Sequence, residues 1–309
     1  MVLNRARTSV APSATNASRP GGLTVVADGL LLPECPRWRD GRFWFSDFYA
    51  LTVSWIAPSG EVQVCCRLDD RPGGLGWMPD GEMLVVSMSR RLLLRVGGTG
   101  DPKVHADLTS FGDGPLNDLL VDGGGRAYVG GFGYDLFGGE PGRPAPLLCV
   151  EPDGTARVVA RRLRFPNGMV LLDERTLVVA ETFASCLTAF DRRLDGSLHG
   201  RRLWAAIAGV PPSTPDGIAV DAAGCMWVAD PGGRRVVRVA HGGTIMSVID
   251  TAPERPFACA LGGADGRTML ICVGRSADPE RARQQQAGRL LQTRVPVPAR
   301  SKDGEDDKH

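Results

Sequence analysis

The sequence predicts an all-β fold, a six-bladed β-propeller, from three observations. A short Gly/Asp turn followed at once by strand-forming residues occurs six times along the 309 residues. The period is about 40–50 residues, which is the length of one four-stranded propeller blade. The 40 Gly and 23 Pro residues suit many short strands joined by turns, and no apolar stripe with helical spacing persists over several turns.

The six repeats divide the chain evenly. The turns are Asp40-Gly41, Asp80-Gly81, Gly124-Gly125, Asp173-Glu174-Arg175, Ala223-Gly224 and Asp265-Gly266. The strands expected after them are residues 42–45, 82–86, 126–129, 176–179, 225–228 and 267–270. A sheet of this size cannot bury both of its faces alone, so the blades stack into a ring, and ring closure removes the two open ends. We therefore expect one domain over residues 23–298, with one loop of each blade at a common channel mouth.

The two ends of the chain lie outside the repeat. Residues 1–22 are polar and lack the 7–15-residue apolar core of a signal peptide, so we expect a disordered leader. The charged residues 299–309 are expected to form a disordered tail. Residues 288–295 read as a late strand, which we expect to share one sheet with residues 23–27 and so complete the first blade.

Composition excludes several classes of function. The net charge of +1 gives no electrostatic reason to expect nucleic acid or an anionic membrane as a partner. No apolar run approaches the ~18–20 residues that span a bilayer. The eight cysteines form neither a CxxC motif nor a Cys/His cluster, and no GxSxG motif is present. Without an export signal, we expect free thiols and a cytoplasmic location; the oligomeric state stays open.

The segment ahead of each turn is expected to be the innermost strand of its blade. Each of these segments has a Pro near its start, where the missing N–H is tolerated. Four of them then carry an oxygen-bearing side chain at the equivalent position: Glu34, Asn117, Asn167 and Asp216. Two carboxylates and two amides that converge on one channel mouth are the ligands that a hard divalent cation such as calcium prefers.

A purely structural reading of two of these motifs is open. Asn-Gly and Asp-Gly are common turn dipeptides, so Asn167-Gly168 and Asp216-Gly217 taken singly are consistent with simple turns. The presence of four oxygen-bearing residues at matching repeat positions favours a shared site. Asp118, next to Asn117, is expected to point away from the channel and to bond backbone groups, if the strand alternates.

Taken in order, the motifs resemble a known family. They are ECPRW at residues 34–38, LND at 116–118, FPNG at 165–168 and TPDG at 214–217, followed by the strand WVAD at 227–230. This set is similar to that of the regucalcin (senescence marker protein) / gluconolactonase family. The resemblance covers about residues 23–297, and it implies a six-bladed propeller with one divalent metal at the channel mouth and, in several members, hydrolysis of sugar lactones.

The resemblance assigns roles to individual residues. It implies that Glu34, Asn167 and Asp216 are the protein ligands of the metal, and that Asp216 also serves as the general base. Asn117 matches a residue that contacts the substrate or a metal-bound water. The expected cation is Ca²⁺, with Zn²⁺, Mg²⁺ and Mn²⁺ as alternatives.

Two departures concern the substrate. Pro115 stands where sugar lactonases of the family often have Arg, and Asp135 falls near the position of a family Glu that is linked to sugar recognition. Asp135 is therefore a candidate substrate-binding residue, but the usual aldonolactone substrate is in doubt. The aromatic and glycine-rich residues 131–139 are expected to shape a different wall of the pocket.

These expectations converge on a lactonase-type carboxylic ester hydrolase. The cation would polarise the carbonyl of a small lactone or ester, and Asp216 would activate water. Two alternatives use the same site: a propeller that binds calcium or a small molecule without turnover, and a phosphotriesterase-like hydrolase. No nucleic-acid or membrane partner is expected.

Overall fold

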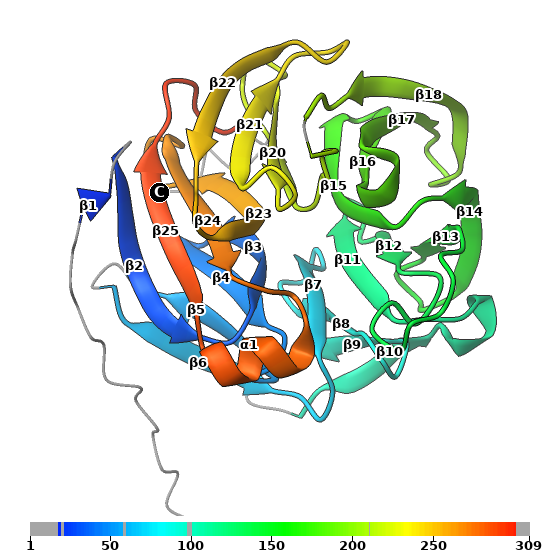
Figure 1. The fold of residues 1–309 in the computed structure, drawn as a ribbon. Coiled ribbons are helices and arrows are strands. Elements are labelled where there is room, and N and C mark those ends of the chain that lie inside the picture. Colours follow the sequence, from blue (N-terminus) through cyan, green and yellow to red (C-terminus); the bar gives the residue numbers. More distant parts are fainter. Residues whose placement is uncertain (1–17, 20–21, 58–59, 98–100, 210, 301–309) are drawn as a thin grey trace, which may run out of the picture.

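The protein is a closed ring of six antiparallel sheets, which confirms the predicted six-bladed propeller (Figure 1). The computed structural model describes residues 18–19, 22–57, 60–97, 101–209 and 211–300. Within these ranges no helix is long and apolar enough to cross a membrane.

The strands of each blade are arranged from the channel outward in the order given. The first contains β3 (Pro33–Arg39), β4 (Arg42–Asp47), β5 (Thr52–Ile56) and β6 (Val62–Arg67). The second contains β7 (Pro72–Trp77), β8 (Met83–Ser87), β9 (Leu92–Val96) and β10 (Lys103–Asp107). The third contains β11 (Leu116–Val121), β12 (Ala127–Gly131), β13 (Ala145–Val150) and β14 (Ala156–Leu163).

The remaining blades follow the same order. The fourth contains β15 (Pro166–Asp173), β16 (Thr176–Glu181), β17 (Cys186–Arg192) and β18 (Leu198–Ala206). The fifth contains β19 (Ile218–Val220), β20 (Met226–Asp230), β21 (Arg235–Val239) and β22 (Ile245–Asp250). The sixth contains β23 (Arg255–Gly262), β24 (Thr268–Gly274), β25 (Gly288–Arg294), β2 (Leu23–Leu30) and β1 (Ser18–Arg19).

The six predicted turns join the inner strand of each blade to its second strand. In the first blade, Asp40 and Gly41 have φ values of 50° and 71°. Positive φ at both central residues is typical of the two-residue hairpin turn whose twist matches that of paired strands. The strands predicted after the turns are present as β4, β8, β12, β16, β20 and β24.

The ring is closed by strands from both ends of the chain. β25 pairs with β24 on one side and with β2 on the other, where Val25 lies opposite Leu291. The predicted sheet shared by residues 23–27 and 288–295 is therefore confirmed.

Parts of the expected leader and tail belong to the described residues. Ser18–Arg19 of the expected leader pairs with β2. In the expected tail, the Ala299 N–H donates to the Gly266 carbonyl at 2.7 Å. Residues 1–17, 20–21 and 301–309, the rest of both segments, lie outside the described residues.

The core lies between neighbouring blades. Trp227 of the fifth blade is buried in a cluster with Cys259 and Met269 of the sixth. Between the third and fourth blades, Tyr128 packs in a cluster with Leu177. Large apolar side chains at these boundaries fix each blade against the next one.

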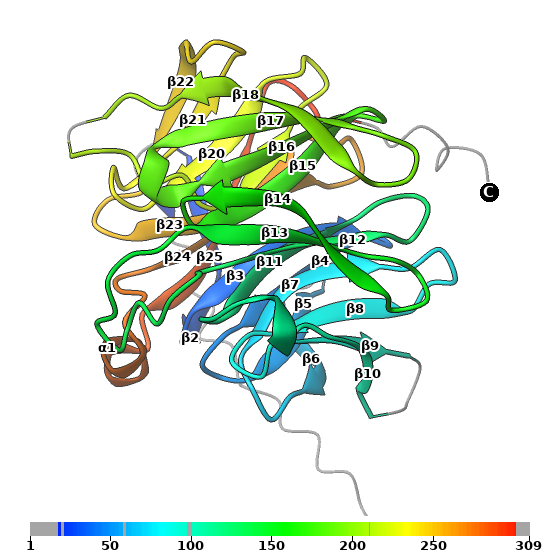
Figure 2. The ribbon, with the colours of Figure 1, turned by 90° about the vertical axis from the view of Figure 1, so that its right-hand side faces the viewer.

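A short helix, α1 (Pro279–Gln285), lies between β24 and β25 and was not predicted. The Asp278 carboxylate caps it by accepting the Arg281 N–H at 2.9 Å. The helix follows Gly274, which pairs with Arg255 at the start of β23. It therefore projects from the face of the ring at which the inner strands begin, as the side view in Figure 2 shows.

Candidate active site

The inner strands begin at one end of the channel, and most of them are bulged there. The register shifts between Glu34 and Arg37 in β3, between Leu116 and Leu119 in β11, and between Pro166 and Met169 in β15. Equivalent shifts occur near the starts of β7 and β23. A bulge redirects a side chain and is common beside active sites. Asn117 and Asn167 both lie inside such a bulge.

The glycines of FPNG and TPDG permit close contact between inner strands. A Cβ on Gly168 would lie 2.6 Å from the Ile218 nitrogen, and a Cβ on Gly217 would lie 2.5 Å from the Ala258 Cβ. The backbones bond directly: the Gly168 N–H donates to the Asp216 carbonyl at 3.2 Å, and the Gly217 N–H donates to the Phe257 carbonyl at 2.8 Å. Neither glycine has a positive φ. Asn167-Gly168 therefore lies within the inner strand β15, and its simple-turn reading is wrong. Asp216-Gly217 directly precedes β19 and is bonded across to β20, where the Asp216 N–H donates to the Ala229 carbonyl at 2.9 Å.

Among the three predicted metal ligands, Asp216 interacts with both Glu34 and Asn167. Glu34 is buried, and its pKa is raised to about 8, mainly by burial and further by the charge of Asp118. Burial also raises the pKa of Asp216 well above its ordinary value, and the charge of Glu34 is the next largest cause. A hydrogen bond from Asn167 and the N–H of Gly217 act in the opposite direction on the pKa of Asp216. Glu34, Asn167 and Asp216 thus share one electrostatic environment.

Asn167 is held in place by a short chain of hydrogen bonds. Its Nδ2 donates to the Thr182 Oγ1 at 3.2 Å, and that hydroxyl donates to the Pro215 carbonyl at 2.8 Å. This chain ties the bulge of β15 to the residue that precedes Asp216. The amide of Asn167 and the carboxylate of Asp216 are therefore positioned together.

Asn117 is buried with an unused donor. It is 5% exposed, and its Nδ2 has no hydrogen-bond partner among the described residues. A buried amide that lacks a partner costs about 1–3 kcal/mol, so such groups mark places where a ligand or ordered water binds. Asn117 is thus suited to contact a bound molecule.

Asp118 and Arg37 form a charged support that the sequence reasoning described only in part. Asp118 accepts the Leu119 N–H at 2.7 Å, which confirms its expected bond to the backbone. The same oxygen accepts from Arg37 at 2.6 Å, and its charge raises the pKa of both Glu34 and Asp216. Its influence therefore extends to the site. In the sequence, Arg37 was marked only by its place in the ECPRW motif of an inner strand. In the structure, its guanidinium group donates to the Leu75 and Leu119 carbonyls.

The hydrogen bonds of Asp135 are made within its own loop and not with Glu34, Asn117, Asn167 or Asp216. Its side chain is exposed and accepts the Gly138 N–H at 2.9 Å, while its own N–H donates to Glu140 at 2.9 Å. These bonds close the loop after β12. The substrate-binding role of Asp135 stays a prediction.

A row of phenylalanines borders the third and fourth blades. Phe132 and Phe165 have ring centroids 4.3 Å apart, Phe137 packs on the first at 6.5 Å, and Phe183 packs on the second at 4.9 Å. Phe165 lies two residues before Asn167, and the Phe132 N–H donates to the Pro115 carbonyl at 2.9 Å. Because Phe137 and Phe183 are 40% and 45% exposed, this aromatic row can contact a bound molecule.

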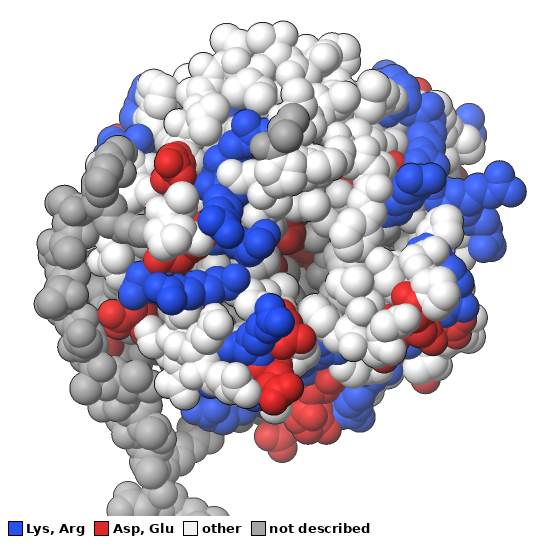
Figure 3. Space-filling model, viewed as in Figure 1, with Lys and Arg blue, Asp and Glu red and all other residues white. Residues whose placement is uncertain are grey.

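The donor set fits a hard cation. The candidate donors are the carboxylates of Glu34 and Asp216 and the amide oxygen of Asn167. Within the described residues, no three His, Cys, Asp or Glu side chains form a metal-binding group. Glu34 and Asp216 repel each other when both are ionised, and a positive charge between them would relieve that repulsion. Figure 3 shows that this face of the ring is hollowed at its centre, with acidic atoms inside the hollow.

Comparison with known proteins gives consistent matches. Residues 32–275 match the family described as SMP-30/Gluconolactonase/LRE-like region. The chain is 28% identical over 281 residues to 6-deoxy-6-sulfogluconolactonase of Pseudomonas putida, covering 89% of this chain and 94% of the relative. It is 28% identical to pentonolactonase XacC of Haloferax volcanii, covering 80% and 83%. It is 29% identical to regucalcin of Danio rerio, covering 85% and 90%.

Solved structures share the fold at lower identity. A luciferin-regenerating enzyme superposes with a TM-score of 0.76 at 15% identity, covering 90% of this chain and 96% of that one. The calcium-binding protein regucalcin of Agrobacterium tumefaciens gives a TM-score of 0.75 at 22% identity, covering 89% and 94%. A gluconolactonase of Xanthomonas campestris gives 0.71 at 21% identity, covering 96% and 99%.

Proposed function

This chain belongs to the SMP-30/gluconolactonase/LRE-like family, and from that premise we propose that it is a metal-dependent lactonase whose active site is the channel mouth. One observation carries the proposal: Glu34, Asn167 and Asp216 share one charged environment at the start of the inner strands. Relatives named lactonases, which act on sulfonated and pentose-derived lactones by their names, support the reaction class.

Glu34, Asn167 and Asp216 would hold one divalent cation. Because all the donors are oxygen atoms, calcium is the first candidate, with Zn²⁺, Mg²⁺ and Mn²⁺ as alternatives. A similar structure named a calcium-binding protein supports the same choice. When bound, the cation supplies Lewis-acid polarisation of the lactone carbonyl.

Asp216 is the proposed general base. In the cation-free protein its raised pKa favours the protonated carboxyl, which cannot accept a proton. A positive charge held beside it favours the ionised form, and its carboxylate oxygen then accepts the proton of the attacking water. Asn167 keeps this carboxylate in position through its own bonds to Thr182.

Other residues bind the substrate. The unused Nδ2 of Asn117 would donate a hydrogen bond to an oxygen of the lactone. The aromatic row of Phe132, Phe137, Phe165 and Phe183 would pack against the ring substituent and exclude water from that side. With Pro115 beside this row, a lactone with an apolar substituent is a better candidate than an unsubstituted sugar lactone.

The test is an activity assay on metal-stripped protein. A panel of sugar lactones, apolar lactones, simple esters and a phosphotriester is offered with calcium, zinc, magnesium or manganese restored one at a time. We expect one cation to restore hydrolysis of at least one lactone. Asp216→Asn, which keeps a side chain of the same size, is expected to fold normally and to lower kcat by at least ~10²-fold.

The outcomes separate the alternatives. If Asp216→Asn is as active as the parent, the assignment of the base is wrong. Hydrolysis of the phosphotriester alone would favour the phosphotriesterase-like reaction. If the parent binds a cation but turns over no compound of the panel, the non-catalytic calcium-binding propeller is correct, the candidate that the relatives named regucalcin favour.

A cytoplasmic location is also part of the proposal. All eight cysteines are free thiols, as expected for a reducing compartment. The absence of nucleic-acid and membrane partners stays a prediction, and the oligomeric state stays open.

A further inference from the structure

A second cavity, called here the cavity of the fourth blade, lies where the end of β14 meets that blade. Its volume is about 360 Å³, and its lining includes Arg162 of β14, Arg164 of the β14–β15 connection and residues of β16, β17 and β18. Four arginines line it: Arg162, Arg164, Arg201 and Arg202. The one acidic side chain in its lining is Glu181.

Glu181 is fully engaged by the wall of this cavity. It is 1% exposed, and its Oε2 accepts the Arg164 N–H at 2.7 Å. Its Oε1 accepts from the Thr188 hydroxyl at 2.5 Å and from Arg201 Nη2 at 2.7 Å. Arg201 also donates to the Arg161 and Arg162 carbonyls at 3.3 and 3.2 Å. The Glu181 carboxylate therefore holds the guanidinium group of Arg201 against the wall. It forms no ion pair with the other three arginines of the lining.

Two arginines of the cavity have unused side-chain donors. Among the described residues, the hydrogen bonds of Arg162 and Arg164 involve their backbone groups and not their guanidinium groups. Arg202 is paired at 2.6 Å, but its partner Asp191 is an exposed residue outside the lining. Arg162 has a φ of 63°, a conformation that costs free energy for a residue other than glycine. Two of the four arginines are thus paired with a carboxylate, Arg201 with Glu181 and Arg202 with Asp191, while Arg162 and Arg164 add positive charge without such a partner among the described residues.

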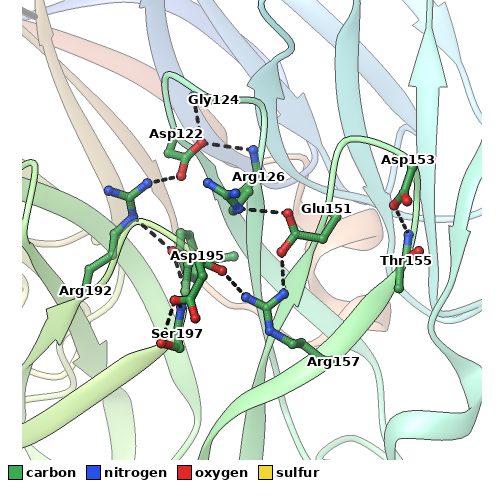
Figure 4. A network of polar contacts seen from close by, with 12 residues as sticks. Asp122, Gly124, Arg126, Glu151, Asp153, Thr155, Arg157, Arg192, Asp195 and Ser197 are labelled. Atoms are coloured by element: carbon green, nitrogen blue, oxygen red, sulfur yellow. Dashed lines mark hydrogen bonds and ion pairs between the residues drawn. The ribbon is translucent and has the colours of Figure 1, made fainter.

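The general arginine content of the chain does not explain this concentration. A larger cavity of about 890 Å³ is lined by three arginines, but also by three acidic residues. There Arg192 pairs with Asp122, and Figure 4 shows the neighbouring Arg126 and Arg157 paired with Glu151, while Arg157 also donates to the Asp195 carbonyl. Its charges are balanced, whereas the cavity of the fourth blade has four arginines against one carboxylate. On the face shown in Figure 3, Lys and Arg side chains gather at the edge where β14 and β18 lie.

We propose that the cavity of the fourth blade binds a small molecule through a phosphate or sulfate group. Planar guanidinium groups match the oxygens of such anions with two parallel hydrogen bonds each. A volume of about 360 Å³ is that of a small-ligand site. This site is distinct from the proposed lactonase site and does not depend on it.

The test is a titration of the full chain with inorganic phosphate, pyrophosphate and sulfate at low ionic strength. Binding is measured by calorimetry and by the change in melting temperature. We expect saturable binding of at least one anion with one site per chain. The variant Arg162→Gln/Arg164→Gln should lower its affinity at least ~10-fold. The matched control, Arg175→Gln/Arg193→Gln, removes the same two charges from the balanced cavity and should bind as the parent does.

Two results would overturn the proposal. One is the absence of saturable binding by the parent. The other is equal weakening in both double variants, because that reports only the net charge of the protein. Ala184→Glu provides an independent check if the arginine variant misfolds, since it adds a carboxylate to the same lining. Unchanged anion binding by this variant would also contradict the site.

Discussion

Glu34 links the ionisation of the site to the stability of the protein. Its pKa rises from the ordinary 4.5 to about 8. Between these pH values the unfolded chain releases the proton and the folded protein keeps it, so the free energy of unfolding falls as pH rises. In the cation-free parent, we expect the free energy of unfolding to decline between about pH 4.5 and 8, at no more than about 1.4 kcal/mol per pH unit for this group. The decline should be smaller in Glu34→Gln.

Chemical denaturation in a chelating buffer at several pH values measures this decline. Saturating cation should remove it, because a cation binds the ionised carboxylate and stabilises the folded state. The pKa of Asp216 is raised in the same direction, so Glu34→Gln keeps part of the slope. Identical pH profiles for the parent and Glu34→Gln would contradict the assignment.

Asn117 provides a second prediction for a single residue. Replacing it with Ala removes a buried donor that has no partner among the described residues, so the melting temperature should stay the same or rise slightly. If Asn117 holds the substrate, Asn117→Ala should raise KM more than it lowers kcat, with cation affinity unchanged. Steady-state kinetics and a cation titration measure both quantities. A large loss of stability with unchanged KM would show that the amide is structural.

For single elements, the sequence predicted the hairpins well and the inner strands less well. The turns and second strands depend on local residues, so all six were predictable. Asp118 was expected to follow strict alternation, but the bulge between Leu116 and Leu119 breaks that alternation. The role of Gly168 depends on the backbone of the next blade, which no local pattern records. The helix α1 is only seven residues long, too short to show an apolar stripe.

The contact between β15 and the fifth blade gives a prediction for Gly168. A methyl group there would meet backbone atoms of Ile218 and Asp216 at 2.6 and 2.7 Å. Because backbone atoms cannot move aside as a flexible side chain can, Gly168→Ala should lower the free energy of unfolding by about 1–3 kcal/mol. It should also weaken cation binding, because it shifts Asn167 relative to Asp216.

Gly123→Ala is the matched control for this substitution. Gly123 also lacks a positive φ, and no atom lies within 4 Å of an added Cβ. Denaturation curves and cation titrations of the two variants provide the comparison. Equal stability losses in both would mean that close contact between the inner strands does not position the site.

At the scale of the whole molecule, the site depends on a closed ring. The proposed ligands come from the first, fourth and fifth blades, so their geometry is fixed only if the blades remain stacked. The sixth blade completes the ring with β25 between β24 and β2. On opposite faces of β25, Leu290 and Leu291 are both fully buried in two different clusters. This strand therefore joins the N-terminal and C-terminal parts of the chain through apolar contacts as well as hydrogen bonds.

The last prediction tests this closure with Leu291→Ala. Truncation of a fully buried Leu costs about 2–5 kcal/mol, whereas Leu194→Ala, at a residue that is 92% exposed, should change stability by no more than about 0.5 kcal/mol. If closure couples all the blades, Leu291→Ala should still unfold in one transition. Cation at about 100 times its Kd should then return about 2.7 kcal/mol of stability to this variant. Two separate transitions, with only the later one sensitive to cation, would show that the sixth blade unfolds independently of the site.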